Sequence, residues 1–120
     1  MSAPNLTNIS TITAKSLSIE LTTSTPHTLE NPSSSNKVFK VNSIVIGNID
    51  GTNAATISVR LGKSGVSAID IFRTISVPAN SSLVLIDRNS SIYLEEGDVL
   101  LFTPSANNDL VAMINYEEIS

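Results

Sequence analysis

The strongest constraint on the fold is a strict alternation of apolar and polar residues at positions 55–61. Ala, Ile, Val and Leu occupy the odd positions there, and Thr, Ser and Arg occupy the even positions. A period of two places every apolar side chain on one face of a β-strand, so that one face is buried and the other is solvated. Alternation recurs at 17–21 and, less strictly, at 69–77 and 110–116, and a compact apolar run occupies 83–86. Clusters of Gly, Pro, Asn and Ser separate them, as is typical of turns between strands.

Composition supports the same fold class. Hydrophobic residues make up 41% of the 120 residues, whereas charged residues make up only 15%. Ser, Thr and Asn dominate the remainder, which favours strands and tight turns over helices. About eight short strands at regular spacing predict an all-β protein. We therefore expect one antiparallel β-sandwich that is jelly-roll-like in its connections.

The sequence divides into an N-terminal arm at 1–15 and a sandwich domain at 16–120. The first seven positions are polar and include Pro4. Terminal segments of this kind become ordered when they dock onto a neighbour, so we expect the arm to bind a partner. Its candidate contact residues are Asn5, Leu6, Ile9 and Ile12.

The alternation changes phase near the start of the expected sandwich. Ile12 does not fall on the face that begins at Leu17. A β-bulge or a break near Thr13 and Ala14 would explain the change, because an extra residue shifts the later side chains to the opposite face.

An acidic corner at 93–102 is expected to organise the fold. Gly97 permits a positive φ angle that other residues adopt only with strain. The side chain of Asp98 can accept a hydrogen bond from the backbone just ahead of it and fix the corner. A second structural turn is expected at Asp50 and Gly51, because Asp-Gly is a strong signal for a β-hairpin.

Three acidic residues at the corner allow two interpretations. Glu95, Glu96 and Asp98 could supply oxygen ligands to Ca²⁺. They could instead form a solvated turn in which Asp98 caps the corner. We favour the turn, because the sequence has no ladder of oxygen ligands like that of an EF-hand loop. We expect no metal and no other cofactor.

No catalytic motif is present. His27 is the only histidine and stands in a polar loop, and no Gly-x-Ser-x-Gly or phosphate-binding glycine loop occurs. There are no cysteines, which excludes thiolate metal sites and disulfides. The net charge of −4 disfavours nucleic-acid binding. We therefore expect a protein that is not an enzyme.

No apolar run approaches the length of a membrane span, which is about 20 residues. The first ten residues also lack the basic and apolar regions of a secretory signal. We expect no membrane partner and synthesis in a cytoplasm.

Four stretches together resemble a known group of proteins. They are 37–60, 75–86, the Tyr-Leu-Glu-Glu-Gly-Asp motif at 93–98 and the Ile-Asn-Tyr-Glu-Glu motif at 114–118. This layout, which covers about 37 to 119, resembles the small β-sandwich virion proteins of tailed bacteriophages, especially those of marine and cyanobacterial phages. The motifs that carry the resemblance are structural turns and strands.

The resemblance implies a virion structural protein made in the cytoplasm of a host bacterium. A capsid decoration (cement) protein is the first interpretation, with the major capsid protein or other virion proteins as partners. Such a protein would be a homo-oligomer, and a trimer is favoured. The alternative is a tail or neck component, or a receptor-binding module that uses the loops at 48–53 and 104–109.

Overall fold

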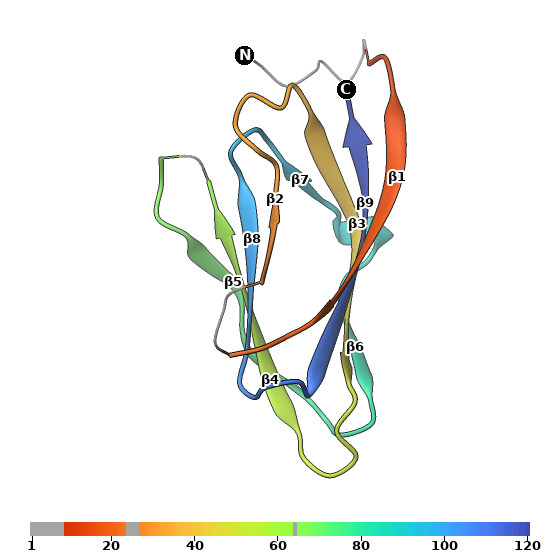
Figure 1. Cartoon of the computed structure of the whole chain (residues 1–120), viewed down its shortest axis with the longest axis vertical. Coiled ribbons are helices and arrows are strands. Elements are labelled where there is room, and N and C mark those ends of the chain that lie inside the picture. Colours follow the sequence, from red (N-terminus) through yellow and green to blue (C-terminus); the bar gives the residue numbers. More distant parts are fainter. Residues whose placement is uncertain (1–8, 24–26, 64) are drawn as a thin grey trace.

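The computed structural model describes residues 9–23, 27–63 and 65–120. Two antiparallel β-sheets pack face to face, and the only helical element among these residues is the short 3₁₀ turn η1 (Arg88–Ser90) (Figure 1). The predicted all-β sandwich is thus confirmed. Nine strands are present in the described residues, where about eight were expected.

One sheet contains five strands in the order β1-β9-β3-β6, and β7 pairs with β3 beyond the end of β6. Their bounds are β1 (Ile12–Glu20), β9 (Leu110–Ile119), β3 (Val38–Asn48), β6 (Ser82–Ile86) and β7 (Ile92–Leu94). The other sheet contains four strands in the order β2-β8-β4-β5. Their bounds are β2 (His27–Glu30), β8 (Val99–Pro104), β4 (Ala55–Gly62) and β5 (Ile69–Val77).

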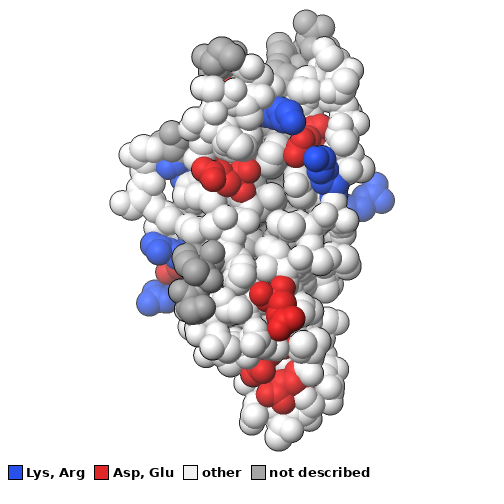
Figure 2. Space-filling view, viewed as in Figure 1, with Lys and Arg blue, Asp and Glu red and all other residues white. Residues whose placement is uncertain are grey.

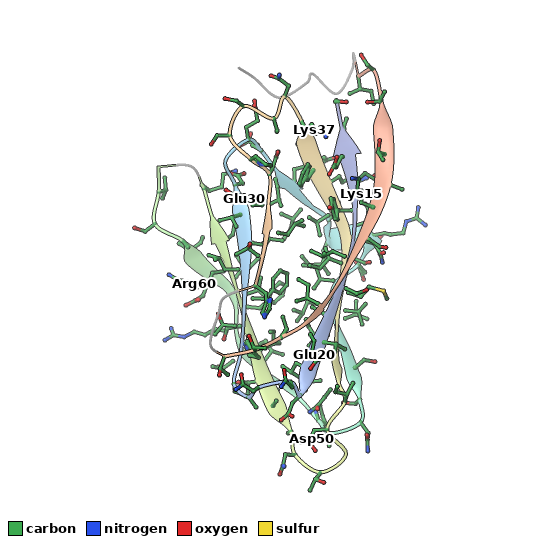
Figure 3. All side chains as sticks on the ribbon, viewed as in Figure 1. Lys15, Glu20, Glu30, Lys37, Asp50 and Arg60 are labelled. Atoms are coloured by element: carbon green, nitrogen blue, oxygen red, sulfur yellow. The ribbon has the colours of Figure 1, made fainter. Side chains whose placement is uncertain are left out.

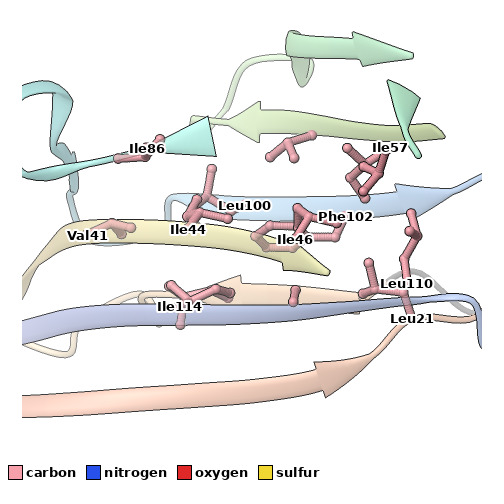
Figure 4. Close-up of a cluster of buried hydrophobic side chains, with 14 of the residues drawn as sticks. Leu21, Val41, Ile44, Ile46, Ile57, Ile86, Leu100, Phe102, Leu110 and Ile114 are labelled. Atoms are coloured by element: carbon pink, nitrogen blue, oxygen red, sulfur yellow. The ribbon is translucent and has the colours of Figure 1, made fainter. Parts of the chain in front are cut away.

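The core lies between the two sheets, where the apolar positions of the alternating runs meet. Ile44 and Ile46 of β3 and Ile114 of β9 gather there with Leu100 and Phe102 of β8, and all five are fully buried (Figure 4). Burial of each such side chain stabilises the fold by about 1.5–3 kcal/mol relative to exposure. The sandwich is therefore held together mainly by branched aliphatic side chains.

The Asp50-Gly51 turn does not form the predicted hairpin. It joins β3 to β4, which lie in different sheets and do not pair. Oδ1 of Asp50 accepts hydrogen bonds from the N–H groups of Thr52 (2.8 Å) and Asn53 (3.3 Å). These bonds hold the pKa of Asp50 below its usual value of 3.8. The Asp-Gly signal identified a chain reversal correctly, but local turn chemistry does not determine which strands pair after it.

Strand β1 begins at Ile12 rather than at residue 16, so part of the expected arm belongs to the sheet. Its register with β9 is unbroken from Ile12, opposite Ile119, to Glu20, opposite Val111. The expected bulge near residues 13 and 14 is therefore wrong. The strand is long because β9 extends far enough to pair with all of it. The candidate arm residues Asn5 and Leu6 lie outside the described residues.

A β-bulge occurs instead in β3. The register between β3 and β9 shifts between Val41 and Ser43, which leaves Asn42 as an extra residue. Before the bulge Phe39 and Val41 are buried, and after it Ile44 is buried. The bulge thus moves the buried face from odd to even positions.

Two buried asparagines, Asn31 in the loop before β3 and Asn48 at the end of β3, tie the loops to the sheets. Asn31 is fully buried, and its Nδ2 donates to the carbonyl oxygens of Lys37 (2.8 Å) and Leu94 (3.0 Å). Nδ2 of Asn48 donates to the carbonyl oxygens of Asn53 (3.0 Å) and Val77 (2.9 Å). Buried polar groups need such partners, so both amides act as structural links.

Candidate functional site: the open edge of strand β1

Strand β1 forms a long sheet edge. Among the described strands it pairs with β9 alone. Ladder bonds are made at the odd-numbered positions of β1, because Thr11 exchanges hydrogen bonds with Ser120, and the Leu21 N–H donates to the Leu110 carbonyl. In an antiparallel pair the residues between such positions point their N–H and C=O groups away from the partner. The residues whose backbone groups face the open edge are therefore Ile12, Ala14, Ser16, Ser18 and Glu20.

The other edges of the two sheets are short or irregular. The register of β5 with β4 shifts twice, and Thr74 within β5 has a φ of 46°. Strand β2 has four residues. Strands β6 and β7 have five and three residues, and the turn η1 lies between them in the sequence. Short strands and bulges are the usual means of preventing edge-to-edge pairing, and β1 has neither.

The first half of β1 is also accessible on both faces. Residues 12–16 are all exposed, and Ile12 is 53% exposed. Lys15 points to the face that bears Glu118, and their side chains lie 3.7 Å apart. Glu118 also pairs with Lys37 at 2.9 Å. Figure 3 shows Lys15 and Lys37 at the same end of the molecule. These ion pairs join side chains only and do not engage the outward backbone groups of β1.

The outer face of the five-stranded sheet carries an uncharged row beside this edge. Ser18, Met113, Val45 and Val84 lie opposite one another across four strands. Met113 is 46% exposed and Val84 is 58% exposed. On the face seen in Figure 2, charged side chains likewise form small separate groups with uncharged surface between them. Surfaces of this kind favour contact with other proteins over contact with polyanions.

The acidic corner is built as a structural turn. Gly97 has a φ of 86°, which confirms the predicted positive value. Asp98 is 1% exposed, and its Oδ2 accepts a hydrogen bond from the Glu95 N–H at 2.8 Å, as predicted. The carbonyl of Asn31 accepts from the Gly97 N–H at 2.8 Å. The corner is thus fixed to the loop that precedes β3.

A lysine takes the place that a cation would occupy at this corner. Nζ of Lys63 lies 2.6 Å from Oδ2 of Asp98 and 2.9 Å from Oε2 of Glu95. These two carboxylates raise the pKa of Lys63 above 10.5. Glu96 turns elsewhere and accepts from the Asn36 N–H at 3.0 Å. No three His, Cys, Asp or Glu side chains are grouped to hold a metal ion in the described parts of the chain.

Lys63 is the residue of this cluster that sequence analysis missed. It belongs to the β4–β5 turn, far from the corner in the sequence. No local pattern indicates the contact, because it depends on how β4 and β8 align in the sheet.

His27 opens strand β2. Its Nε2 accepts a hydrogen bond from the Thr22 N–H at 3.2 Å and lies 3.1 Å from Oγ1 of Thr22. The ring nitrogen that a catalytic base would use is therefore engaged in a structural contact.

Within the described residues, no helix is long and apolar enough to cross a membrane.

The two loops considered for receptor binding lie together. The Ile49 N–H donates to the carbonyl oxygen of Asp109 at 2.8 Å. Ile49 is 59% exposed. Asp50, in the same loop, lies at the lower tip of the molecule in Figure 3. The structure therefore brings the loops at 48–53 and 104–109 to one end of the sandwich.

Comparisons with protein-family models, with curated proteins and with solved structures give no significant match for this chain.

Proposed function

We propose that this protein is a structural protein of a bacteriophage virion that decorates and stabilises the capsid. The observation that carries the proposal is the open edge of β1, which combines length, regular register and exposure. An edge of this kind binds an extended segment of another protein by β-strand addition. Main-chain hydrogen bonds then supply affinity without a dedicated pocket.

The strand order supports a jelly-roll fold. The orders β1-β9-β3-β6 and β2-β8-β4-β5 place strands that are distant in the sequence side by side in each sheet. In the described chain, β4 and β5 are the pair joined as a hairpin, whereas most other connections pass from one sheet to the other. Two interlocked Greek keys have this arrangement, and the jelly roll is a frequent fold of viral capsid domains.

The proposed partner is the major capsid protein or another virion protein. A homo-oligomer, with a trimer favoured, would present several β1 edges at once. Linked edges bind far more tightly than one edge alone, because the second contact forms at high effective concentration. The uncharged row around Met113 and Val45 supplies additional apolar contact. Neither contact requires catalysis, so the proposed role is not enzymatic.

The position and the copy number of the protein in intact virions test this role. Quantitative mass spectrometry against the major capsid protein, combined with electron cryomicroscopy, would measure both. We expect many copies at repeated positions on the shell. A few copies confined to the tail would contradict decoration and favour a tail or neck component.

A receptor-binding module is the second candidate. It is favoured by the contact between Ile49 and Asp109, which joins two loops into one exposed tip. Exchange of residues 49–52 for a Gly-Ser segment, which keeps the buried Asn48 and its partner Asn53, would abolish attachment to host cells under this hypothesis. Decoration of the capsid would be unaffected by the same change.

A further inference from the structure

We propose that a polar recess on the outer face of the five-stranded sheet binds a neutral saccharide. The recess is open and has a volume of about 340 Å³, which is at the lower end of the range for ligand pockets. Its side-chain lining comes from Ala14, Ser16, Asn42, Asn115 and Glu117. This proposal does not depend on the decoration of a capsid.

The recess exists because two local features coincide. The bulge at Asn42 adds a residue to β3 opposite β9. On the other side of β9, strand β1 presents the small residues Ala14 and Ser16. Bulges bend and twist a sheet and redirect side chains, while small neighbours leave space above the backbone. Lys15 and Tyr116 complete the lining. Because side chains alternate, these two contribute their backbone as the floor.

Hydrogen bonds within the lining orient its polar groups. Nδ2 of Asn42 donates to Oε1 of Glu117 at 3.3 Å. Nδ2 of Asn115 donates to Oγ of Ser43 at 2.9 Å. Within the described residues, no hydrogen bond engages Oε2 of Glu117 or the amide oxygen of either asparagine. Three acceptor atoms are therefore available, and the hydroxyl group of Ser16 belongs to the same lining.

This set of groups matches a ligand rich in hydroxyl groups. Adjacent sugar hydroxyls donate to carboxylate and amide oxygens and accept from serine hydroxyls. The acceptor-rich lining disfavours an anion. A cation is disfavoured because Lys40 lies opposite Glu117 in the register of β3 and β9, so a positive side chain already stands on the neighbouring strand. A neutral saccharide satisfies both conditions.

Tyr93 extends the site along the sheet. It lies opposite Lys40 across β3 and β7, and it is 44% exposed. Its strand is two strand spacings from β9, which is about 10 Å. An exposed ring at this distance offers an apolar surface to a second sugar unit. A disaccharide would therefore bind more tightly than either monosaccharide.

A chemical-shift titration of the ¹⁵N-labelled full chain tests the proposal. The probes are glucose, galactose, mannose, N-acetylglucosamine and disaccharides of each. We expect at least one of them to shift the amide signals of Ser16, Asn115 and Glu117. Because the recess is small and open, the dissociation constant should be about 1 mM.

Matched variants locate the binding. Glu117→Ala and Ser16→Leu should each weaken binding about tenfold, the equivalent of one lost contact. Thr103→Ala, on the exposed face of the other sheet, should leave the affinity unchanged. Thermal melts verify that each variant is folded. The proposal is overturned if no saccharide shifts these amides, or if Glu117→Ala and Ser16→Leu both bind as well as the wild type. It is also overturned if arginine methyl ester shifts the amides and the saccharides do not.

Discussion

Thr11 and Ser120 exchange two backbone hydrogen bonds. The Thr11 N–H donates to the Ser120 carbonyl oxygen at 2.8 Å, and the Ser120 N–H donates to the Thr11 carbonyl oxygen at 2.9 Å. This pairing near the ends of β1 and β9 sets the register of the edge. Every second residue from Ile12 onward consequently turns its N–H and C=O groups outward. The register therefore determines which amide groups a partner strand can reach.

Removal of the buried carboxylate at the acidic corner should destabilise the fold more than removal of its exposed neighbour. Asp98→Ala deletes the acceptor for the Glu95 N–H and for Lys63, and should lower the free energy of unfolding by about 2 kcal/mol. Glu95→Ala removes only an exposed ion pair with Lys63 and should cost less than about 1 kcal/mol. Urea titrations measure both. Equal losses would show that Asp98 does not fix the corner.

The corner should also make stability depend on alkaline pH. The carboxylates of Asp98 and Glu95 raise the pKa of Lys63 in the folded protein above 10.5. This stabilisation is fully present below the pKa that the lysine has in the unfolded chain. It is lost as pH rises through the pKa of Lys63 in the folded protein. The free energy of unfolding should therefore fall above about pH 10.5.

Lys63→Met is the control for this pH dependence, and its stability should fall less steeply in the same range. Burial also raises the pKa of Tyr116. Tyr116 titrates in both proteins, so the difference between the two curves isolates Lys63. Parallel curves for the two proteins would rule out the lysine as the cause.

The two glycines predicted at turns should respond differently to substitution. Gly97 has a φ of 86°, so Gly97→Ala should cost about 1–2 kcal/mol from backbone strain. Gly51 has no such φ, and an added Cβ would meet Asn80 only at ordinary contact distance, 3.7 Å. Gly51→Ala should therefore change stability by less than about 1 kcal/mol. Chemical denaturation of both variants distinguishes them, and a larger loss for Gly51→Ala would contradict the assignment.

The buried asparagines should contribute separately to stability. Asn31→Ala and Asn48→Ala each leave two carbonyl groups without their donor, which should cost about 2 kcal/mol apiece. Asn31 lies in the loop before β3 and Asn48 ends β3, and the two residues share no partner. The double variant should therefore lose the sum of the two values. A loss well below the sum in denaturant titrations would show that the two ends of the sandwich are coupled.

Local patterns in the sequence predict most of the fold but little of the pairing. The alternation at 55–61 identified β4 correctly because a half-buried strand requires that period. The Asp50-Gly51 turn was mistaken for a hairpin. Its turn chemistry is the same whether the next strand pairs with the preceding one or passes to the other sheet. The bulge at Asn42 was missed. The sequence does indicate it, because the large apolar residues change from odd positions, Phe39 and Val41, to even positions, Ile44 and Ile46.

The candidate edge could be predicted only in part. The sequence placed a docking element near Ile12, but assigned residues 12–15 to an arm, because the strand depends on β9 at the other end of the chain. The contact of Lys63 with Asp98 likewise depends on sheet alignment. The recess depends on three strands at once, so no single segment indicates it.

Substitution of Ser18 tests the proposed docking edge most directly. Its N–H points outward, so Ser18→Pro removes one edge donor without breaking a ladder bond to β9. Ser18→Ala changes the same side chain but keeps the donor. Co-sedimentation with capsid shells prepared without this protein measures binding, and circular dichroism verifies folding. We expect Ser18→Pro to fold and to lose binding, while Ser18→Ala binds like the wild type. Full binding by folded Ser18→Pro would contradict the assignment of β1 as the docking edge.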